Sequence, residues 1–62
     1  MLIGENIRFY RQQHALSQEE LAEKMDTSRQ TISSWENGKT YPNIQSLISL
    51  SNIFNTPKKS LI

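Results

Sequence analysis

The stretch that decides the fold is SQEELAEKMDTSRQTISSWENG, residues 17–38, which predicts two short helices joined by a tight turn. Ser17 and Glu20 have the spacing of a capping box, in which each side chain satisfies a free backbone donor at the start of a helix. Asp26 makes the turn, because aspartate enters the left-handed region at modest cost. Ser28 then caps the second helix. Both helices therefore have defined starts on either side of one turn.

The second helix, residues 28–37, has one apolar side and one polar side. At about 100° per residue, Thr31, Ile32 and Trp35 share the side that is expected to pack. Solvated helix faces more usually alternate Glu and Lys, whereas Arg, Gln and Asn can pair bidentately with guanine and adenine. The polar stripe therefore predicts contact with base edges, with an ordinary solvated face as the alternative. It consists of Arg29, Gln30, Ser33, Ser34 and Asn37.

The segment before this pair predicts another helix. Ile3, Ile7 and Tyr10 recur at four- and three-residue spacing, so they share one side of a helix over residues 3–13. Leu16 follows as an expected core residue. The inward positions of the next helix are Leu21, Ala22 and Met25.

The segment that begins at Gly38 predicts two more helices. Gly38 ends the helix before it, because glycine accepts the left-handed conformation found after many helices. Asn43 can cap a fourth helix, and Thr56 with Pro57 is an expected start for a short fifth one. Leu61 would then turn back toward the core. The apolar positions of the fourth helix are Ile44, Leu47, Ile48, Leu50 and Phe54.

Composition limits the class of protein. A chain of 62 residues allows one domain, residues 1–62, and domains of this size bury only about 60% of their unfolded surface. Without cysteine, neither a disulfide nor a thiolate metal site can form, and His14 has no second histidine as a metal partner. No phosphate-binding loop and no nucleophile with a paired base is recognisable. We therefore expect no enzyme activity, no metal and no cofactor.

Charge and hydropathy add weaker expectations. No apolar run approaches the roughly 20 residues of a membrane helix, so we expect a cytoplasmic domain without membrane contact. The net charge of +1 indicates nucleic acid only weakly. Its distribution predicts one acidic and one basic surface, with a mixed solvated surface as the alternative. The acidic cluster is Glu19, Glu20 and Glu23, and the separate basic residues are Arg8, Arg11, Arg29 and Lys39.

The longer motif LSQEELAEKMDTSRQTISSWENGKTYPNIQSL resembles the Cro and phage-repressor type of helix-turn-helix domain, the Xre family, and the resemblance covers about residues 3–61. It implies a compact, all-α, five-helix lambda-repressor-like fold with the helix-turn-helix at about residues 17–37. The chain stops directly after its last expected core residue, which suggests the hypothesis that it is the N-terminal part of a longer regulator with a C-terminal effector or oligomerisation segment. The parts of the motif that are jointly specific are Leu16, Gln18, Ala22, Ile32, residues 35–38 and Pro42.

The resemblance implies that the helix over residues 28–37 enters the major groove of DNA. By position, Arg29 suits guanine, Gln30 suits adenine, and Ser34 and Ser33 are further base-contact candidates. Gln18 matches a position that contacts a phosphate and braces the first reading residue. The complete set of expected phosphate contacts is Gln18, Ser28, Asn37, Lys39, Thr40, Tyr41 and Arg8. For the loop residues among them, capping and surface packing are the alternative.

Arg11 and Glu36 match a salt bridge of the family between the first helix and the end of the recognition helix. Arg11 would then be structural, and Arg8 would be the arginine freer to reach DNA. Trp35 allows a base-stacking hypothesis, but its place beside Ile32 favours core packing. His14 is interpreted as solvated or capping.

The leading function is sequence-specific binding of double-stranded DNA by a transcriptional regulator, with repression as the expected sign and a homodimer on an inverted-repeat operator. The alternative is an antitoxin-like protein-interaction module with secondary DNA binding, because one fold can serve both. Enzyme activity is the weakest hypothesis.

Overall fold

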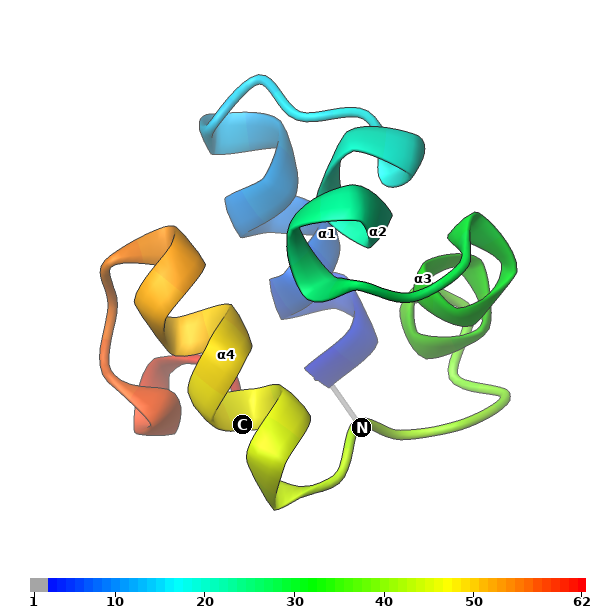
Figure 1. Ribbon diagram of the computed structural model, residues 1–62. Coiled ribbons are helices and arrows are strands. Elements are labelled where there is room, and N and C mark those ends of the chain that lie inside the picture. Colours follow the sequence, from blue (N-terminus) through cyan, green and yellow to red (C-terminus); the bar gives the residue numbers. More distant parts are fainter. Residues whose placement is uncertain (1–2) are drawn as a thin grey trace.

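A computed structural model describes residues 3–62 and consists of helices and their connections, with no strand among these residues. Figure 1 shows α1 at the centre, α3 on one side of it and α4 on the other. None of the helices in this range is both long and apolar enough to cross a membrane. The all-α prediction is confirmed. The elements are α1 (Ile3–Gln13), α2 (Gln18–Met25), α3 (Arg29–Glu36), α4 (Ile44–Phe54) and the 3₁₀ turn η1 (Lys58–Ser60).

The helix starts follow from their capping residues. The Ser17 hydroxyl accepts a hydrogen bond from the Glu20 amide at 3.0 Å, and the Glu20 carboxylate accepts one from the Ser17 amide at 2.8 Å. The Ser28 side chain caps α3 and the Asn43 side chain caps α4, each by accepting a hydrogen bond from a backbone N–H of the first turn. Asp26 takes the left-handed conformation between α2 and α3, with φ 57°. The predicted caps of α2, α3 and α4 and the predicted turn at Asp26 are therefore confirmed.

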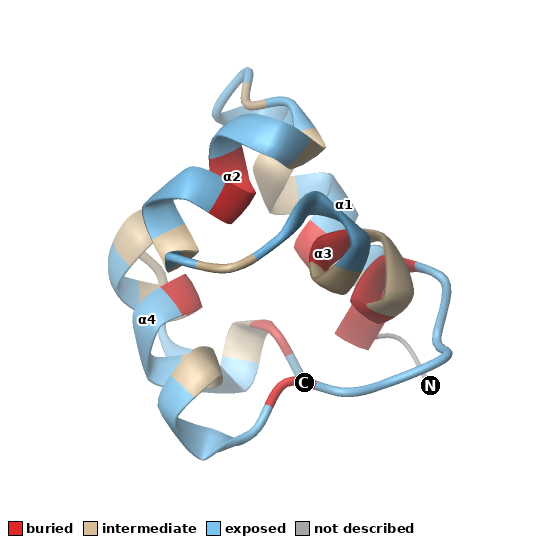
Figure 2. Cartoon of the chain, turned by 45° about the vertical axis from the view of Figure 1, so that its right-hand side comes forward, coloured by how far each residue is buried: buried red, intermediate tan, exposed pale blue. Residues whose placement is uncertain are grey.

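Four helices and the last turn enclose one apolar core. Figure 2 shows the buried positions on the inner sides of the helices. Trp35 is only 6% exposed, so its core assignment is confirmed and it offers no face to a base. The buried apolar residues are Ile3, Ile7, Leu21, Ala22, Ile32, Trp35, Leu50, Phe54 and Leu61.

Gly4 brings α1 against the end of α3. A Cβ atom at this position would lie 2.8 Å from the Glu36 carbonyl oxygen and closer still to that of Trp35. Contacts of this length to main-chain atoms are not relieved by rotating a side chain. The glycine therefore sets the distance between α1 and the helix that carries the polar stripe.

The predicted count of five helices is not confirmed, because the structure has four α-helices followed by a 3₁₀ turn. The final element is a single 3₁₀ turn, and Pro57 precedes it in an extended conformation without a side-chain cap. Leu61 is fully buried directly after this turn, and the side-chain amide of Asn6 (Nδ2) donates to its backbone carbonyl at 2.9 Å. The chain returns to the core within too few residues for a longer helix to form.

The apolar positions of α4 are only partly buried. Leu50 and Phe54 lie in the core, but Ile44 is 62% exposed and Ile48 is 42% exposed. The spacing identifies an apolar side of the helix correctly. It does not say how much of that side the neighbouring helices cover.

Candidate nucleic-acid interface

Helix α3 presents its polar stripe outward from a buried inner side. Ile32, Trp35 and Glu36 are buried against the rest of the domain. Arg29 and Gln30 are exposed, and Ser33 and Ser34 are half-buried. The helix therefore offers several hydrogen-bonding side chains on a rigidly packed support.

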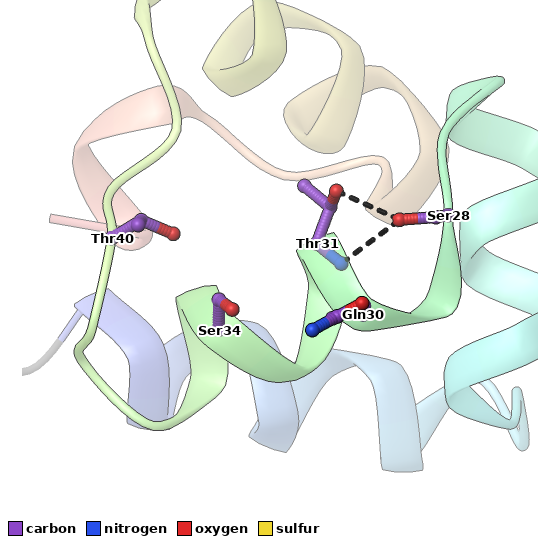
Figure 3. Close-up of a pocket in the computed structure, with 5 residues that line it drawn as sticks. All are labelled: Ser28, Gln30, Thr31, Ser34 and Thr40. Atoms are coloured by element: carbon purple, nitrogen blue, oxygen red, sulfur yellow. Dashed lines mark hydrogen bonds between the residues drawn. The ribbon is translucent and has the colours of Figure 1, made fainter.

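The start of α3 and the loop after it form an open hollow of about 410 Å³. Figure 3 shows its lining side chains, with Thr40 contributed by the loop and the others by α3 and its cap. Thr31 belongs to this surface although its position on the helix predicts packing; its hydroxyl lies 3.0 Å from that of Ser28. The threonine hydroxyl three residues after a capping serine is the signal that could have found it. The lining residues are Ser28, Gln30, Thr31, Ser34 and Thr40.

A buried carboxylate holds the other end of α3. Arg11 Nε donates to Glu36 Oε2 at 2.6 Å, and Arg11 Nη2 donates to Glu36 Oε1 at 3.2 Å. The Glu36 side chain has no exposed surface, and that of Arg11 is only 13% exposed. Arg11 also donates to the Leu16 carbonyl at 2.8 Å. One arginine thus links α1, the loop before α2 and the end of α3.

The electrostatic setting of Glu36 favours its charged form. Burial acts to raise the pKa of this carboxyl, but hydrogen bonds from Arg11, Gln18 and Arg8 and the charge of Arg11 act in the opposite direction. The net result is a pKa below the ordinary value of 4.5. Glu36 is therefore a carboxylate at neutral pH, and it needs the donors around it.

Gln18 joins Glu36 to the polar stripe. Its Nε2 donates to Glu36 Oε1 at 3.1 Å, and its Oε1 accepts from Arg29 Nη1 at 3.4 Å. The first residue of α2 thereby contacts both the last and the first residue of α3. The resemblance implies that Gln18 braces Arg29, but it does not imply the contact between Gln18 and Glu36.

Arg8 is less free than the sequence predicts. Its Nε donates to Glu36 Oε1 at 3.3 Å, and its Nη2 donates to Asn37 Oδ1 at 3.4 Å. The side chain is still 46% exposed. Two arginines share one carboxylate, so one positive charge remains uncompensated beside Asn37 at the end of α3.

The loop after α3 is fixed to that helix by its backbone. Gly38 has φ 76°, as the predicted helix end requires, and the Lys39 amide donates to the Ser34 carbonyl at 2.9 Å. The side chains of Lys39, Thr40 and Tyr41 are exposed beyond this anchor. The loop therefore extends the polar surface from one end of α3.

The sequence matches the family model described as helix-turn-helix over residues 7–61, nearly the whole chain. The chain belongs to the helix-turn-helix family. In this family of DNA-binding domains, α2 and α3 are the two helices of the motif, and Asp26 lies in its turn.

Two relatives have the same kind of domain. Over 62 residues, the whole chain, the protein is 40% identical to the HTH-type transcriptional activator BcrR of Enterococcus faecalis, and the match covers 30% of that relative. Over 48 residues, or 77% of the chain, it is 40% identical to the uncharacterised HTH-type transcriptional regulator MJ0272 of Methanocaldococcus jannaschii, covering 73% of it. The chain thus spans less than a third of BcrR. No solved structure matches it.

His14 lies away from the polar stripe of this helix-turn-helix domain. Its Nε2 is 3.1 Å from the Phe54 carbonyl oxygen, and its ring stacks on the Phe54 ring at 5.5 Å between centroids. It thus satisfies a carbonyl at the C-terminal end of α4, the capping role that the sequence allowed. Within residues 3–62, no group of three or more His, Cys, Asp or Glu residues is placed to hold a metal ion.

Proposed function

We propose that this domain binds double-stranded DNA sequence-specifically as part of a transcriptional regulator, with α3 in the major groove. The observation that carries the proposal is the polar outer side of α3, which stands on an inner side fixed by Trp35 and the Glu36 ion pair. A helix presented in this way can lie in the major groove with its N-terminal residues at the base edges. DNA as the partner also favours action in the cytoplasm.

In this proposal, residues in the first turns of α3 contact the DNA bases. Arg29 has the paired donors that suit guanine, and Gln30 has the donor and acceptor that suit adenine. Both are exposed, and Ser34 lies beside Gln30 in the lining of the hollow. Ser33 is a secondary base contact, because its hydroxyl already accepts a hydrogen bond from the side-chain Nδ2 of Asn37 at 3.3 Å.

Residues at both ends of the helix-turn-helix motif are proposed to contact the DNA phosphates. Gln18 lies at the start of α2, where free backbone donors and the helix dipole favour an anion. At the other end, the uncompensated charge of Arg8 and the exposed loop residues supply donors. These contacts set the register of the helix on DNA. The complete proposed set is Gln18, Ser28, Asn37, Lys39, Thr40, Tyr41 and Arg8.

A homodimer on an inverted repeat completes the proposal. Ile44 and Ile48 are spaced four residues apart on α4, and both are exposed, as is Ile62 at the end of the chain. Apolar side chains of this kind favour pairing with a second copy, which would set two half-sites about one helical turn apart. The longer regulator would carry its effector region beyond this domain.

Repression is the simpler sign of regulation to propose, because a bound dimer needs only to cover a promoter. The E. faecalis relative is named an activator. A promoter-reporter measurement with and without the full-length regulator distinguishes the two, since repression lowers and activation raises the reporter signal.

The direct test is selection of bound sites from random duplexes with the wild type, Arg29→Ala and Gln30→Ala. Each variant should lose discrimination at its own base position by about 1–3 kcal/mol and keep it elsewhere. Gln45→Ala, an exposed polar change on α4, is the matched control and should keep every preference. Affinity should also fall linearly with the logarithm of salt concentration. Unchanged base preference in both α3 variants would contradict the proposed readout.

A further inference from the structure

Gln18 lies between two groups of opposite hydrogen-bonding character. The Glu36 carboxylate can only accept hydrogen bonds, and the Arg29 guanidinium can only donate them. The Gln18 amide satisfies both, with Nε2 toward Glu36 at 3.1 Å and Oε1 toward Arg29 at 3.4 Å. Only one direction of the amide satisfies both neighbours. The carboxylate therefore determines which end of Gln18 faces the polar stripe.

Glu36 is itself held from several sides. Arg11 donates to both of its oxygens, and Arg8 donates to Oε1 at 3.3 Å. Its side chain has no exposed surface, so it has no path to a base or a phosphate. Glu36 is therefore a fixed hydrogen-bond acceptor beneath the surface that α3 presents. Gln18 connects it to Arg29 at that surface.

We propose that Glu36 is a specificity-determining positioning residue, which orients Arg29 through Gln18 and so strengthens the preference for the base that Arg29 reads. This inference rests on the proposed DNA binding. It assigns a role in base selection to a carboxylate that does not touch DNA, and it makes the relay Glu36–Gln18–Arg29 a unit.

The lengths of the two contacts suit such a relay. Arg29 is exposed, and a free arginine side chain has many rotamers whose entropy ordering on DNA would remove. Contact with Gln18 restricts the guanidinium before DNA arrives. The contact at 3.4 Å is the longer of the two, so the guanidinium can leave it for the two acceptors of a guanine.

The test compares site selection by the wild type with that by Gln18→Met and Glu36→Gln. Methionine keeps the length of Gln18 but has no amide, and a glutamine at 36 can face Gln18 with either end, so the direction of the Gln18 amide is no longer set. Both variants should weaken the preference at the Arg29 base by about fivefold or more. The preference at the Gln30 base should remain.

Arg8→Met is the matched control. It removes a donor to the same Glu36 oxygen but leaves the Gln18 contacts in place. It should weaken binding to all duplexes alike. If Gln18→Met and Glu36→Gln also weaken all base positions equally, the relay is overturned, because their effect is then structural or limited to phosphate contact.

A measurement without DNA separates this inference from the proposed function. ¹⁵N relaxation of Arg29 Nε in the free protein should show a more mobile side chain in both variants than in the wild type, with Arg8→Met unchanged. Gln18 is half-buried at the start of α2 and is uncharged, so Gln18→Met remains informative if Glu36→Gln unfolds. Equal mobility in wild type and Gln18→Met overturns the relay. Absence of sequence preference in the wild type instead overturns the proposed DNA binding, even where Arg29 mobility changes as expected.

Discussion

Helices α3 and α4 both carry apolar residues at helical spacing, but they use them differently. The inner residues of α3, Ile32 and Trp35, are buried almost completely. On α4, Leu50 and Phe54 are buried while Ile44 and Ile48 remain exposed. Similar periodic patterns therefore give one helix whose apolar side is fully covered and one whose apolar side is covered only in part.

The neighbours of each helix explain the difference. Helix α3 packs against both α1 and α2, which together cover its inner side. Helix α4 contacts α2, η1 and α1, and these contacts leave its first turns open. Residue spacing predicts the direction of an apolar side, whereas its covered width depends on helices that are distant in sequence. The covered helix is suited to present a reading surface, and the open one is suited to a partner.

The largest effect on stability should come from truncating a buried side chain on the inner side of α3. Trp35→Ala should lower the free energy of unfolding by about 3–5 kcal/mol, because it deletes a buried aromatic ring and leaves a cavity. Urea denaturation followed by circular dichroism measures this loss. Tyr41→Ala is the aromatic control in an exposed loop and should change stability by about 0.5 kcal/mol or less. Equal losses in the two variants would mean that Trp35 is not part of the core.

The second effect concerns the carboxylate at the end of α3. Glu36→Gln should lower stability at neutral pH by about 1.5–3 kcal/mol, because charge-assisted hydrogen bonds from Arg11 become neutral ones. The pKa of Glu36 in the folded state lies below 4.5, so its ionisation stabilises the fold above that pH. This stabilisation is lost as the pH falls through the lowered pKa.

The stability gap between wild type and Glu36→Gln should therefore be largest at neutral pH and shrink in acid. Urea unfolding of both proteins across this range measures the gap. The other carboxyl groups titrate in both proteins, so they largely cancel in the comparison. A gap that stays constant below pH 4.5 would exclude an ionised, donor-stabilised Glu36 as the cause.

A third effect tests how closely α1 approaches α3. Gly4→Ala should cost about 1–3 kcal/mol, because its Cβ would meet the main-chain carbonyls of Trp35 and Glu36. Gly38→Ala is the matched control: it has open space for a Cβ, but its φ of 76° disfavours alanine by about 1 kcal/mol. Thermal unfolding of both variants separates close packing from backbone strain. A loss at Gly4 no larger than that at Gly38 would refute the close approach.

Local chemistry explains which features the sequence predicts well. The bounds of α1, the capping serines and the left-handed Asp26 depend on residues within a few positions of one another. Gly4 against α3 and Arg8 against Glu36 depend on contacts between α1 and the end of α3, so no periodic pattern reveals them.

The sequence of α3 predicts its polar stripe, but it predicts only part of the side-chain network that holds α3 in place. The resemblance supplied Arg11 opposite Glu36, whereas the contact between Gln18 and that carboxylate depends on side-chain geometry across the turn. The exposure of Ile44 likewise depends on what covers α4. The residues facing outward on α3 can be predicted, but of the side-chain network behind them only the Arg11–Glu36 pair can.

The smallest effect on folding should occur on the open side of α4. Ile44→Ser changes a side chain that is 62% exposed and should alter stability by about 0.5 kcal/mol or less. Leu50→Ala on the same helix removes a fully buried side chain and should cost about 2–5 kcal/mol. Chemical denaturation at low protein concentration compares the two variants as monomers.

The same Ile44→Ser variant also tests whether the open side serves a partner. If a second copy covers it on DNA, the variant should bind an inverted repeat more weakly while binding an isolated half-site as the wild type does. In the proposed binding mode, a half-site is bound by α3 and its flanking contacts alone, whereas the full site also gains from pairing of two domains. Gel-shift titrations on both duplexes measure the two affinities. Equal affinity of wild type and variant for the inverted repeat would exclude Ile44 from the dimer contact and leave the open side of α4 for another partner.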